Sequence, residues 1–293
     1  MRYARRMDES RNTEDAEYVK VYDHYVKQAD TFAHSWESTM QDRVIRETEI
    51  ESLIKIIKVI NLGNNPKKKT RILEVGCGNG YVSARLLCEF PNLIIEALDV
   101  NSELISAARE RNLPQCEFKV LDITDENAAK FLPEEFDFVF SVRCLINIEE
   151  AEKQLKAIET MGYRLAPNGY LALLEGFITG QDKYNDVRSA FNYSQIPPAW
   201  HNWYLDLTRI DEVTGQKGFL RRLANSLEEI GVDTHHLSSH YLATRVWQPL
   251  LHNDQNHYMN NRNDAIGQAV SKILPRTEDF SPLQIHIWKR ETS

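Results

Sequence analysis

The stretch Lys69-Thr70-Arg71-Ile72-Leu73-Glu74-Val75-Gly76-Cys77-Gly78-Asn79-Gly80-Tyr81 decides the fold of this 293-residue chain. Residues 72–75 are mostly apolar strand formers, a glycine cluster follows at once, and residues 81–87 have the apolar spacing of a helix. A strand, a glycine turn and a helix open a nucleotide-binding βαβ unit. Glycine leaves room for a ligand, and the helix N-terminus points amide groups toward it.

The residues around the glycines narrow the class of ligand. A phosphate loop ends in Gly-Lys-Ser or Gly-Lys-Thr, and these glycines are followed by neither. The spacing is Gly-x-Gly-x-Gly, so Tyr81 stands where a dinucleotide fingerprint has its third glycine. Glu74 would repel a pyrophosphate and attract an ammonium or sulfonium group. The turn therefore favours a positively charged ligand, and a structural turn without a ligand is the alternative.

A second signal is independent of the glycines. A ribose-binding acid is expected at the end of the second strand, about 20 residues further on. Residues 93–100 read as an apolar strand that closes on Asp99 and Val100. A carboxylate can accept hydrogen bonds from both ribose hydroxyls. An ordinary turn residue is the alternative for Asp99, but its spacing from the glycines favours the ligand.

Residues 73–80 resemble the first motif of the class I S-adenosylmethionine-dependent methyltransferases of the small-molecule type, and the resemblance extends over about residues 70–175. It implies S-adenosylmethionine as the cofactor. The residues that it implies in cofactor binding are Glu74, Gly76, Cys77, Gly78, Gly80, Asp99 and Val100.

The same resemblance extends to two later strand ends. It implies that Asp122 accepts the adenine amino group, that the amide of Ile123 meets the ring, and that Ser141 lies near the reacting methyl group. A turn role is the alternative for Asp122. After Ser141 the chain continues Val-Arg-Cys, whereas DNA-adenine and some protein-glutamine methyltransferases continue Pro-Pro-Tyr, so those substrates are disfavoured.

Composition excludes several other classes. The 35 basic and 43 acidic residues give a net charge of −8, which disfavours binding to nucleic acid. The four cysteines lack a Cys-x-x-Cys spacing, so the sequence suggests neither a disulfide framework nor a metal site, and a reducing cytoplasm fits. The first 20 residues are too polar for a secretory signal, and no apolar run is long enough to span a membrane.

Strands and helices alternate regularly from residue 71, which predicts an α/β fold: a doubly wound, mostly parallel seven-stranded sheet with helices on both faces. Strands are expected at 72–75, 93–100, 116–121, 136–141, 170–175, 237–246 and 283–288. Helices are expected at about 43–59, 80–89, 102–111, 150–165 and 217–230. The resemblance implies that the last two strands pair antiparallel.

Two parts of the chain are expected: an N-terminal helical cap at 1–66, and a Rossmann-like methyltransferase domain at 67–293 with lid insertions at about 176–215 and 247–280. In the cap, the face of Trp36 would attract a sulfonium, and Arg46 could hold a methionine carboxylate. The alternatives are a packing anchor for Trp36 and a helix-surface ion pair for Arg46.

The first insertion carries the candidate substrate residues, because a long insertion at the functional end of a sheet is usually a lid or binding loop. They are Tyr184, Arg188, Trp200, Asn202 and Tyr204. A structural aromatic plug over the sheet is an equal alternative. Arg188 and Arg143, and more weakly Arg245, indicate an anionic group on the substrate.

A hydroxyl acceptor needs a base, whereas an amine needs a free lone pair. His201 is the candidate base because it lies in the insertion and can titrate near neutrality, and Glu175 is the second candidate. The sequence thus predicts methyl transfer to an O or N atom of a small molecule, such as a sugar or secondary metabolite, by a cytoplasmic monomer or homodimer that binds no nucleic acid or membrane. A protein or tRNA methyltransferase and a non-catalytic cofactor-binding scaffold are the alternatives.

Overall fold

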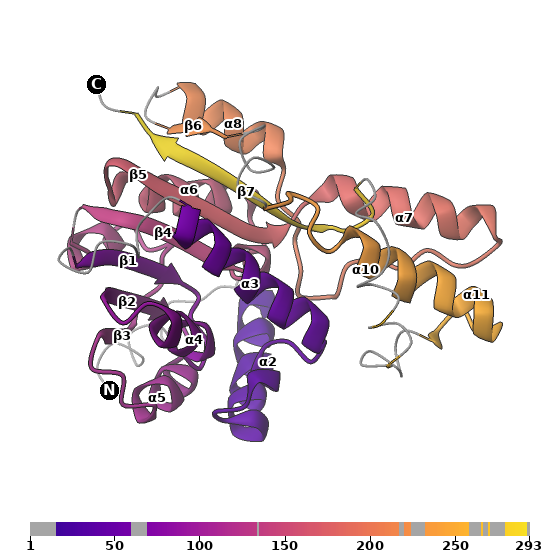
Figure 1. The fold of residues 1–293 in the computed structure, drawn as a ribbon, viewed down its shortest axis with the longest axis horizontal. Coiled ribbons are helices and arrows are strands. Elements are labelled where there is room, and N and C mark those ends of the chain that lie inside the picture. Colours follow the sequence, from indigo (N-terminus) through magenta and orange to yellow (C-terminus); the bar gives the residue numbers. More distant parts are fainter. Residues whose placement is uncertain are drawn as a thin grey trace.

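The computed structural model describes residues 16–59, 69–133, 135–216, 220–223, 232–257, 265, 269 and 279–291. Seven strands form one sheet in the order β3-β2-β1-β4-β5-β7-β6 (Figure 1). Strands β1 to β5 run parallel, and β7 is antiparallel to both of its neighbours. The expected doubly wound, mostly parallel seven-stranded α/β sheet is therefore confirmed.

The strands are β1 (Thr70–Val75), β2 (Leu93–Asp99), β3 (Cys116–Val120), β4 (Phe136–Val142), β5 (Leu165–Gly176), β6 (Leu220–Arg222) and β7 (Leu283–Arg290). The helices are α2 (Ala16–Phe32), α3 (Arg43–Val59), α4 (Tyr81–Glu89), α5 (Ser102–Glu110), α6 (Ala151–Tyr163), α7 (Ile178–Ala190), α8 (Leu207–Gln216), α10 (Ser238–Leu242) and α11 (Gln248–His252). The short helical turns are η2 (Trp36–Ser38), η3 (Ala128–Phe131), η4 (Leu145–Asn147) and η5 (Ala243–Trp247).

Both faces of the sheet are covered, as the run of apolar residues in its central strands requires. Neighbouring residues on β1 belong to opposite sides: Ile72 joins the core cluster formed with α3, α4 and α5, whereas Leu73 joins the cluster formed with α6 and α8. Both side chains are fully buried. The sheet is thereby held rigid, and its carboxyl edge becomes a fixed platform for a ligand.

Several elements gather beyond the carboxyl ends of the parallel strands. In Figure 1 the arrowheads of β1 and β5 point toward the side where α2, α7, α10 and α11 lie. Helix α2 packs against α5, and α7 packs against η5. The cap and both insertions thus meet at the edge of the sheet where ligands of such folds bind.

The C-terminal third differs from the expected elements. Residues 237–246 read as a strand, yet they form α10 and η5, because their apolar residues pack across helical turns against the cap rather than along a sheet. The sixth strand is β6 instead, within the span expected to be the helix 217–230, and only residues 220–223 of that span are described. The expected boundary at residues 66 and 67 and most of the second insertion, 258–278, lie outside the described residues.

Candidate functional site

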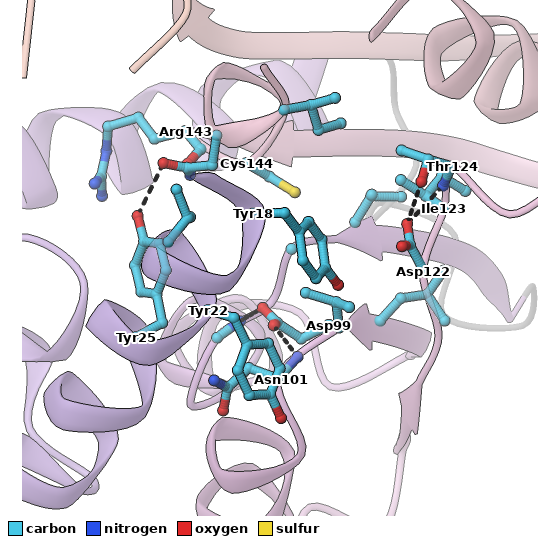
Figure 2. A pocket seen from close by; sticks show the side chains of 18 of the residues that line it. Tyr18, Tyr22, Tyr25, Asp99, Asn101, Asp122, Ile123, Thr124, Arg143 and Cys144 are labelled. Carbon is cyan, nitrogen blue, oxygen red and sulfur yellow. Dashed lines mark hydrogen bonds between the residues drawn. The ribbon is translucent and has the colours of Figure 1, made fainter. Parts of the chain in front are cut away.

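A cavity of about 280 Å³ lies at the carboxyl ends of β1, β2 and β4, and α2 forms its opposite wall (Figure 2). The strand ends contribute Gly76, Asp99 and Asp122, and the loop after β4 contributes Arg143 and Asn147. This is the edge at which open α/β sheets bind their ligands. We therefore take this cavity as the candidate site.

The glycine turn forms one side of the cavity. Gly76 and Gly78 line it with φ angles of 77° and 53°, in the left-handed region that glycine tolerates. A Cβ on Gly76 would lie 2.3 Å from the Cβ and Sγ atoms of Cys144. Gly80, at φ 72°, begins α4 and is not part of the lining, and neither is Cys77. The backbone of the first two glycines is thus the part that a ligand can approach.

Asp99 closes the next strand and faces the cavity. Its Oδ2 accepts the Gly78 amide at 2.8 Å, and its Oδ1 accepts the Asn101 amide at 2.9 Å. Burial raises the pKa of Asp99, and these backbone hydrogen bonds oppose the rise. Each carboxylate oxygen has capacity for a further donor. The residue can therefore accept hydroxyl groups while it also orders the glycine turn.

Val100, Asp122 and Ile123 line the cavity as expected from their positions at strand ends. Asp122 Oδ1 accepts the Thr124 amide at 2.9 Å and the Thr124 hydroxyl at 2.7 Å. Within the described part of the chain, its second carboxylate oxygen, Oδ2, accepts no hydrogen bond. This arrangement can accept an amino group at the cavity wall.

Three tyrosines of α2 cover the cavity, and they were missed as site residues although Tyr18, Tyr22 and Tyr25 recur at helical spacing in the sequence. The Tyr22 hydroxyl lies 3.3 Å from the Ser102 hydroxyl, and the Tyr25 hydroxyl donates to Asn147 Oδ1 at 3.2 Å. Burial raises the pKa of Tyr25 to about 12. The helix is thus anchored to both the nucleotide side and the β4 side of the cavity.

The loop after β4 holds an arginine in a strained conformation. Arg143 has φ 49°, and its Nε donates to Glu49 Oε1 at 2.8 Å, while Nη1 donates to the Thr39 carbonyl at 2.9 Å. The Asn147 amide nitrogen in turn donates to the Arg143 carbonyl at 2.9 Å. The Arg143 side chain lines the cavity but its charge is already met by Glu49.

Three polar residues predicted in the site are buried outside the cavity lining. The Ser83 hydroxyl donates to Glu74, and burial raises the pKa of Glu74 to about 8. Glu175 accepts the Ser141 hydroxyl at 2.7 Å and the amides of residues 144–146. Burial raises the pKa of Glu175 to about 7. Glu175 therefore holds the loop after β4 in place. Because its oxygens already accept four hydrogen bonds, the structure does not support its predicted role as a base.

Trp36 and Arg46 also lie outside the lining, although Thr39 between them belongs to it. Arg46 is 5% exposed, and its Nη2 donates to Thr39 Oγ1 at 2.5 Å. Its Nε is buried without a hydrogen-bond partner. Burial, together with the charge of Arg143, lowers the pKa of Arg46 to about 10. A surface ion pair, the alternative for Arg46, is therefore wrong.

The residues proposed to bind substrate from the first insertion do not reach the cavity. Arg188 is 1% exposed, and its guanidinium donates to the backbone carbonyls of Ser194, Arg245 and Gln255. Tyr184 is buried on the Ile196 carbonyl. Arg188 thus holds the insertion together, and the expectation that it receives an anion is wrong because its donors are used internally.

The remaining residues of this group lie beside the cavity rather than in it. Tyr204 packs its ring on Gly176, and Trp200 is 54% exposed. The Asn202 amide donates to the Ala199 carbonyl at 2.8 Å. Arg245 lies over the Tyr241 ring and 3.7 Å from Asp42. These four residues are absent from the lining.

His201 stacks on His24 of α2, with ring centroids 4.9 Å apart, and does not line the cavity. Burial, together with the charge of His24, lowers the pKa of His201 to about 4. His201 lies outside the lining, but its ring meets the Tyr25 ring edge-on with centroids 6.2 Å apart, so its role as the base stays a prediction. Its neighbour Trp203 does line the cavity, because the Trp203 amide donates to the Ile146 carbonyl at 2.7 Å. No sequence signal separates these two positions.

Over the described ranges, the His, Cys, Asp and Glu side chains form no cluster of three or more that could hold a metal ion. Within those ranges, no helix has the length and hydropathy required to cross a bilayer.

Comparison with known proteins finds similarity over part of the chain. Residues 72–169 match the family described as a methyltransferase domain. The malonyl-[acyl-carrier protein] O-methyltransferase 1 of Ilyobacter polytropus is 38% identical over 77 residues, which are 26% of this chain and 27% of that protein. The biotin biosynthesis bifunctional protein BioHC of Teredinibacter turnerae is 26% identical over 182 residues, which are 59% of this chain and 30% of that protein. The matched region thus spans less than a third of either relative.

Solved structures share the fold over nearly the whole chain. The CurJ carbon methyltransferase has a TM-score of 0.53 at 12% identity, covering 95% of this chain and 68% of that one. The plantazolicin methyltransferase BamL, in complex with a triazolic desmethylPZN analog and S-adenosylhomocysteine, has a TM-score of 0.51 at 16% identity, covering 94% of this chain and 97% of that one. At these identities the likeness establishes the fold.

Proposed function

We propose that this chain, whose residues 72–169 match the methyltransferase domain family, is a class I S-adenosylmethionine-dependent methyltransferase that transfers a methyl group to a small molecule. The catalytic domain would comprise residues 67–293, with residues 1–66 as its cap. One relative is named a malonyl-[acyl-carrier protein] O-methyltransferase, and the BamL structure holds a triazolic desmethylPZN analog, so both kinds of substrate are candidates.

The convergence of Asp99 with the glycine turn is the observation that carries the proposal. The Asp99 carboxylate bonds the Gly78 amide at 2.8 Å, and both residues face the same cavity. A ribose placed there would meet a charged acceptor, and the bare backbone of Gly76 and Gly78 would allow the rest of the nucleoside close approach. Asp122 and Ile123, on the next strand end, would hold the adenine.

The amino-acid end of the cofactor also has candidate partners. Arg46 and Arg143 both lie near the carboxylate of Glu49, and Arg46 also lies near Glu74, whose pKa burial raises to about 8. At neutral pH this buried cluster therefore carries more positive than negative charge. Thr39 connects both arginines to the cavity lining. The Arg46 Nε without a partner would be satisfied by a carboxylate. We therefore keep Arg46 as the residue that would hold the methionine carboxylate.

The sulfonium of the cofactor supplies an electrophilic methyl group, so the protein's main task is alignment and exclusion of water. Helix α2 performs the second task, because Tyr18, Tyr22 and Tyr25 cover the cavity and are tied to its walls. The loop after β4 performs the first, since Glu175 fixes the backbone amides of residues 144–146.

Isothermal titration with S-adenosylhomocysteine tests the proposal. We expect binding with a Kd of about 1 μM or tighter for the natural chain. Asp99→Asn preserves the shape but replaces one charged acceptor with an amide donor, so affinity should fall roughly 10- to 150-fold, as loss of a charge-assisted hydrogen bond implies. Arg46→Gln should weaken binding to a similar degree.

The matched control is Asp23→Asn, an exposed change on α2 outside the cavity lining, which should leave affinity unchanged. If Asp99→Asn bound as tightly as the natural chain, the ribose assignment would be wrong. If the natural chain bound no S-adenosylhomocysteine, the proposed activity would fail. Transfer of a labelled methyl group to any acceptor would separate an enzyme from a non-catalytic scaffold.

A further inference from the structure

Building on the proposed function, we infer that the acceptor is the nitrogen of an amine, received between Tyr25, Trp203 and Asn147 with Glu149 and Glu150 at the rim of the cavity. All five residues line the cavity that Asp99 and the glycine turn also line. The inference rests on weighing three kinds of acceptor against the groups that the cavity offers.

The cationic side chains that could bind an anionic acceptor are already in ion pairs. The lining cations in the described part of the chain are Arg143 and Lys153. Arg143 pairs with Glu49 at 2.8 Å, and Lys153 pairs with Glu150 at 2.6 Å. Arg188 lies outside the lining, and its guanidinium donates hydrogen bonds to backbone carbonyls. A carboxylate or phosphate would therefore have to displace an existing partner, which costs free energy.

The lining is instead rich in acidic groups. Asp99, Asp122, Glu149 and Glu150 line the cavity, and the first two belong to the nucleoside end. Arg143 is paired with Glu49 and Lys153 with Glu150, so Glu149 gives the acceptor side a net negative charge. The glutamates stand on the opposite side, at the start of α6, and are exposed. The potential on the acceptor side therefore favours a cation over an anion.

A hydroxyl acceptor would need a base that the described cavity lacks at its acceptor end. Glu175 is occupied by four donors and lies outside the lining, as does His201. The Tyr25 hydroxyl donates to Asn147, and burial raises its pKa to about 12, so it keeps its proton. The carboxylates of Glu149 and Glu150 stand at the exposed rim, whereas a general base must lie within hydrogen-bond reach of the proton that it removes.

An amine that has first released its ammonium proton to water at the open rim needs only to direct its lone pair at the methyl group and to find an acceptor for its N–H. The Asn147 amide nitrogen is held by the Arg143 carbonyl, so its Oδ1 is turned toward Tyr25 and the cavity. That oxygen has a second lone pair with which it can accept an amine N–H. The Trp203 loop is held in place by Gln154, whose Nε2 lies 2.8 Å from the Trp203 carbonyl.

The positive charge that develops on the acceptor nitrogen would also be stabilised by the residues at the acceptor end of the cavity. The amine nitrogen donates its lone pair to the methyl carbon, the carbon–sulfur bond breaks, and its electron pair stays on sulfur as a neutral thioether. The positive charge thus passes from sulfur to nitrogen, and the resulting ammonium releases a proton to water at the open rim. Aromatic faces and carboxylates both stabilise a developing ammonium. Tyr25, Trp203 and Glu149 supply such groups at the acceptor end.

A matched series of three probes tests the inference in protein loaded with S-adenosylhomocysteine. Choline, 3,3-dimethylbutan-1-ol and 3,3-dimethylbutanoate share one shape and carry a positive, zero and negative charge. We expect choline to bind roughly 3- to 30-fold more tightly than the alcohol, as one or two cation–π contacts imply, and the carboxylate to bind least. Titration calorimetry measures all three without requiring turnover.

Two variants locate the effect. Trp203→Leu and Glu149→Gln should each reduce the preference for choline over the alcohol by at least about threefold. Glu152→Gln, an exposed change on the same helix and outside the lining, should leave it unchanged. Equal or tighter binding of the carboxylate, or no binding of choline to the loaded protein, would overturn the amine assignment and leave the proposed function standing. Failure of S-adenosylhomocysteine itself to bind would overturn both.

Discussion

The carboxyl group of Glu74 gives a sharp test of the buried electrostatics under the site. Glu74 is 2% exposed in the middle of the sheet, and the Ser83 hydroxyl donates to it. Burial raises its pKa to about 8, while Ser83 and the charge of Arg46 act in the opposite direction. Replacing Glu74 with Gln keeps the shape and an acceptor oxygen but removes the ionisation.

The expected effect follows from the difference between the folded pKa of about 8 and the ordinary glutamate pKa of 4.5. Between these values the folded carboxyl keeps a proton that the unfolded chain has lost, so stability falls as pH rises. The contribution is fully present below pH 4.5 and is lost by about pH 8. At 1.36 kcal/mol per pH unit this amounts to at most about 5 kcal/mol.

Urea unfolding at pH 5, 6.5, 8 and 9, followed by tryptophan fluorescence, measures this difference. We expect the free energy of unfolding of Glu74→Gln, relative to the natural chain, to rise by several kcal/mol between pH 5 and pH 9. Glu117→Gln, whose parent side chain is 69% exposed, is the control and should give a flat difference. A flat difference for Glu74→Gln as well would refute the raised pKa.

Three further changes probe the turn, the lid and the wall of the cavity. Gly76→Ala places a Cβ 2.3 Å from Cys144 at a φ of 77°, so we expect a loss of about 2–4 kcal/mol in the unfolding free energy, measured by urea denaturation. His201→Ala should leave kcat within about threefold, since a general base is worth roughly 100-fold or more, and a fall of that size would restore His201 as the base. Gln154→Ala removes the contact to the Trp203 carbonyl, and it should raise the Kd of choline in the loaded protein while leaving the Kd of S-adenosylhomocysteine unchanged, as calorimetry would report.

The cofactor end of the site could be predicted because its signals are local. A strand that ends in a glycine turn must bend at that point, and the next strand of a βαβ unit must end beside it. The spacing between Gly76 and Asp99 therefore implied their proximity, and the amide of Gly78 does lie 2.8 Å from Asp99. Asp122 and Ile123 follow by the same rule at the third strand end.

The acceptor end could not be predicted in this way. Arg188 and Trp203 both belong to an aromatic, polar insertion, yet one is buried on backbone carbonyls and the other lines the cavity. Tyr25 carries the helical spacing of an ordinary packing residue, and its hydroxyl meets Asn147 from 122 residues away. Contacts of this kind depend on how segments that are far apart in the sequence pack together. The local pattern of residues does not determine that packing.

The sequence by itself thus determined the parallel strands, the glycine turn and the residues at the strand ends, because periodicity and short-range geometry dictate them. It did not determine the sixth strand, which lies at β6 rather than at residues 237–246. Only the tertiary structure decided which charges remain available at the cavity. It placed Glu49 against Arg143, Asp42 beside Arg245 and backbone carbonyls around Arg188. An arginine receives a ligand only if folding leaves its donors open, and that outcome is a property of packing rather than of residue type.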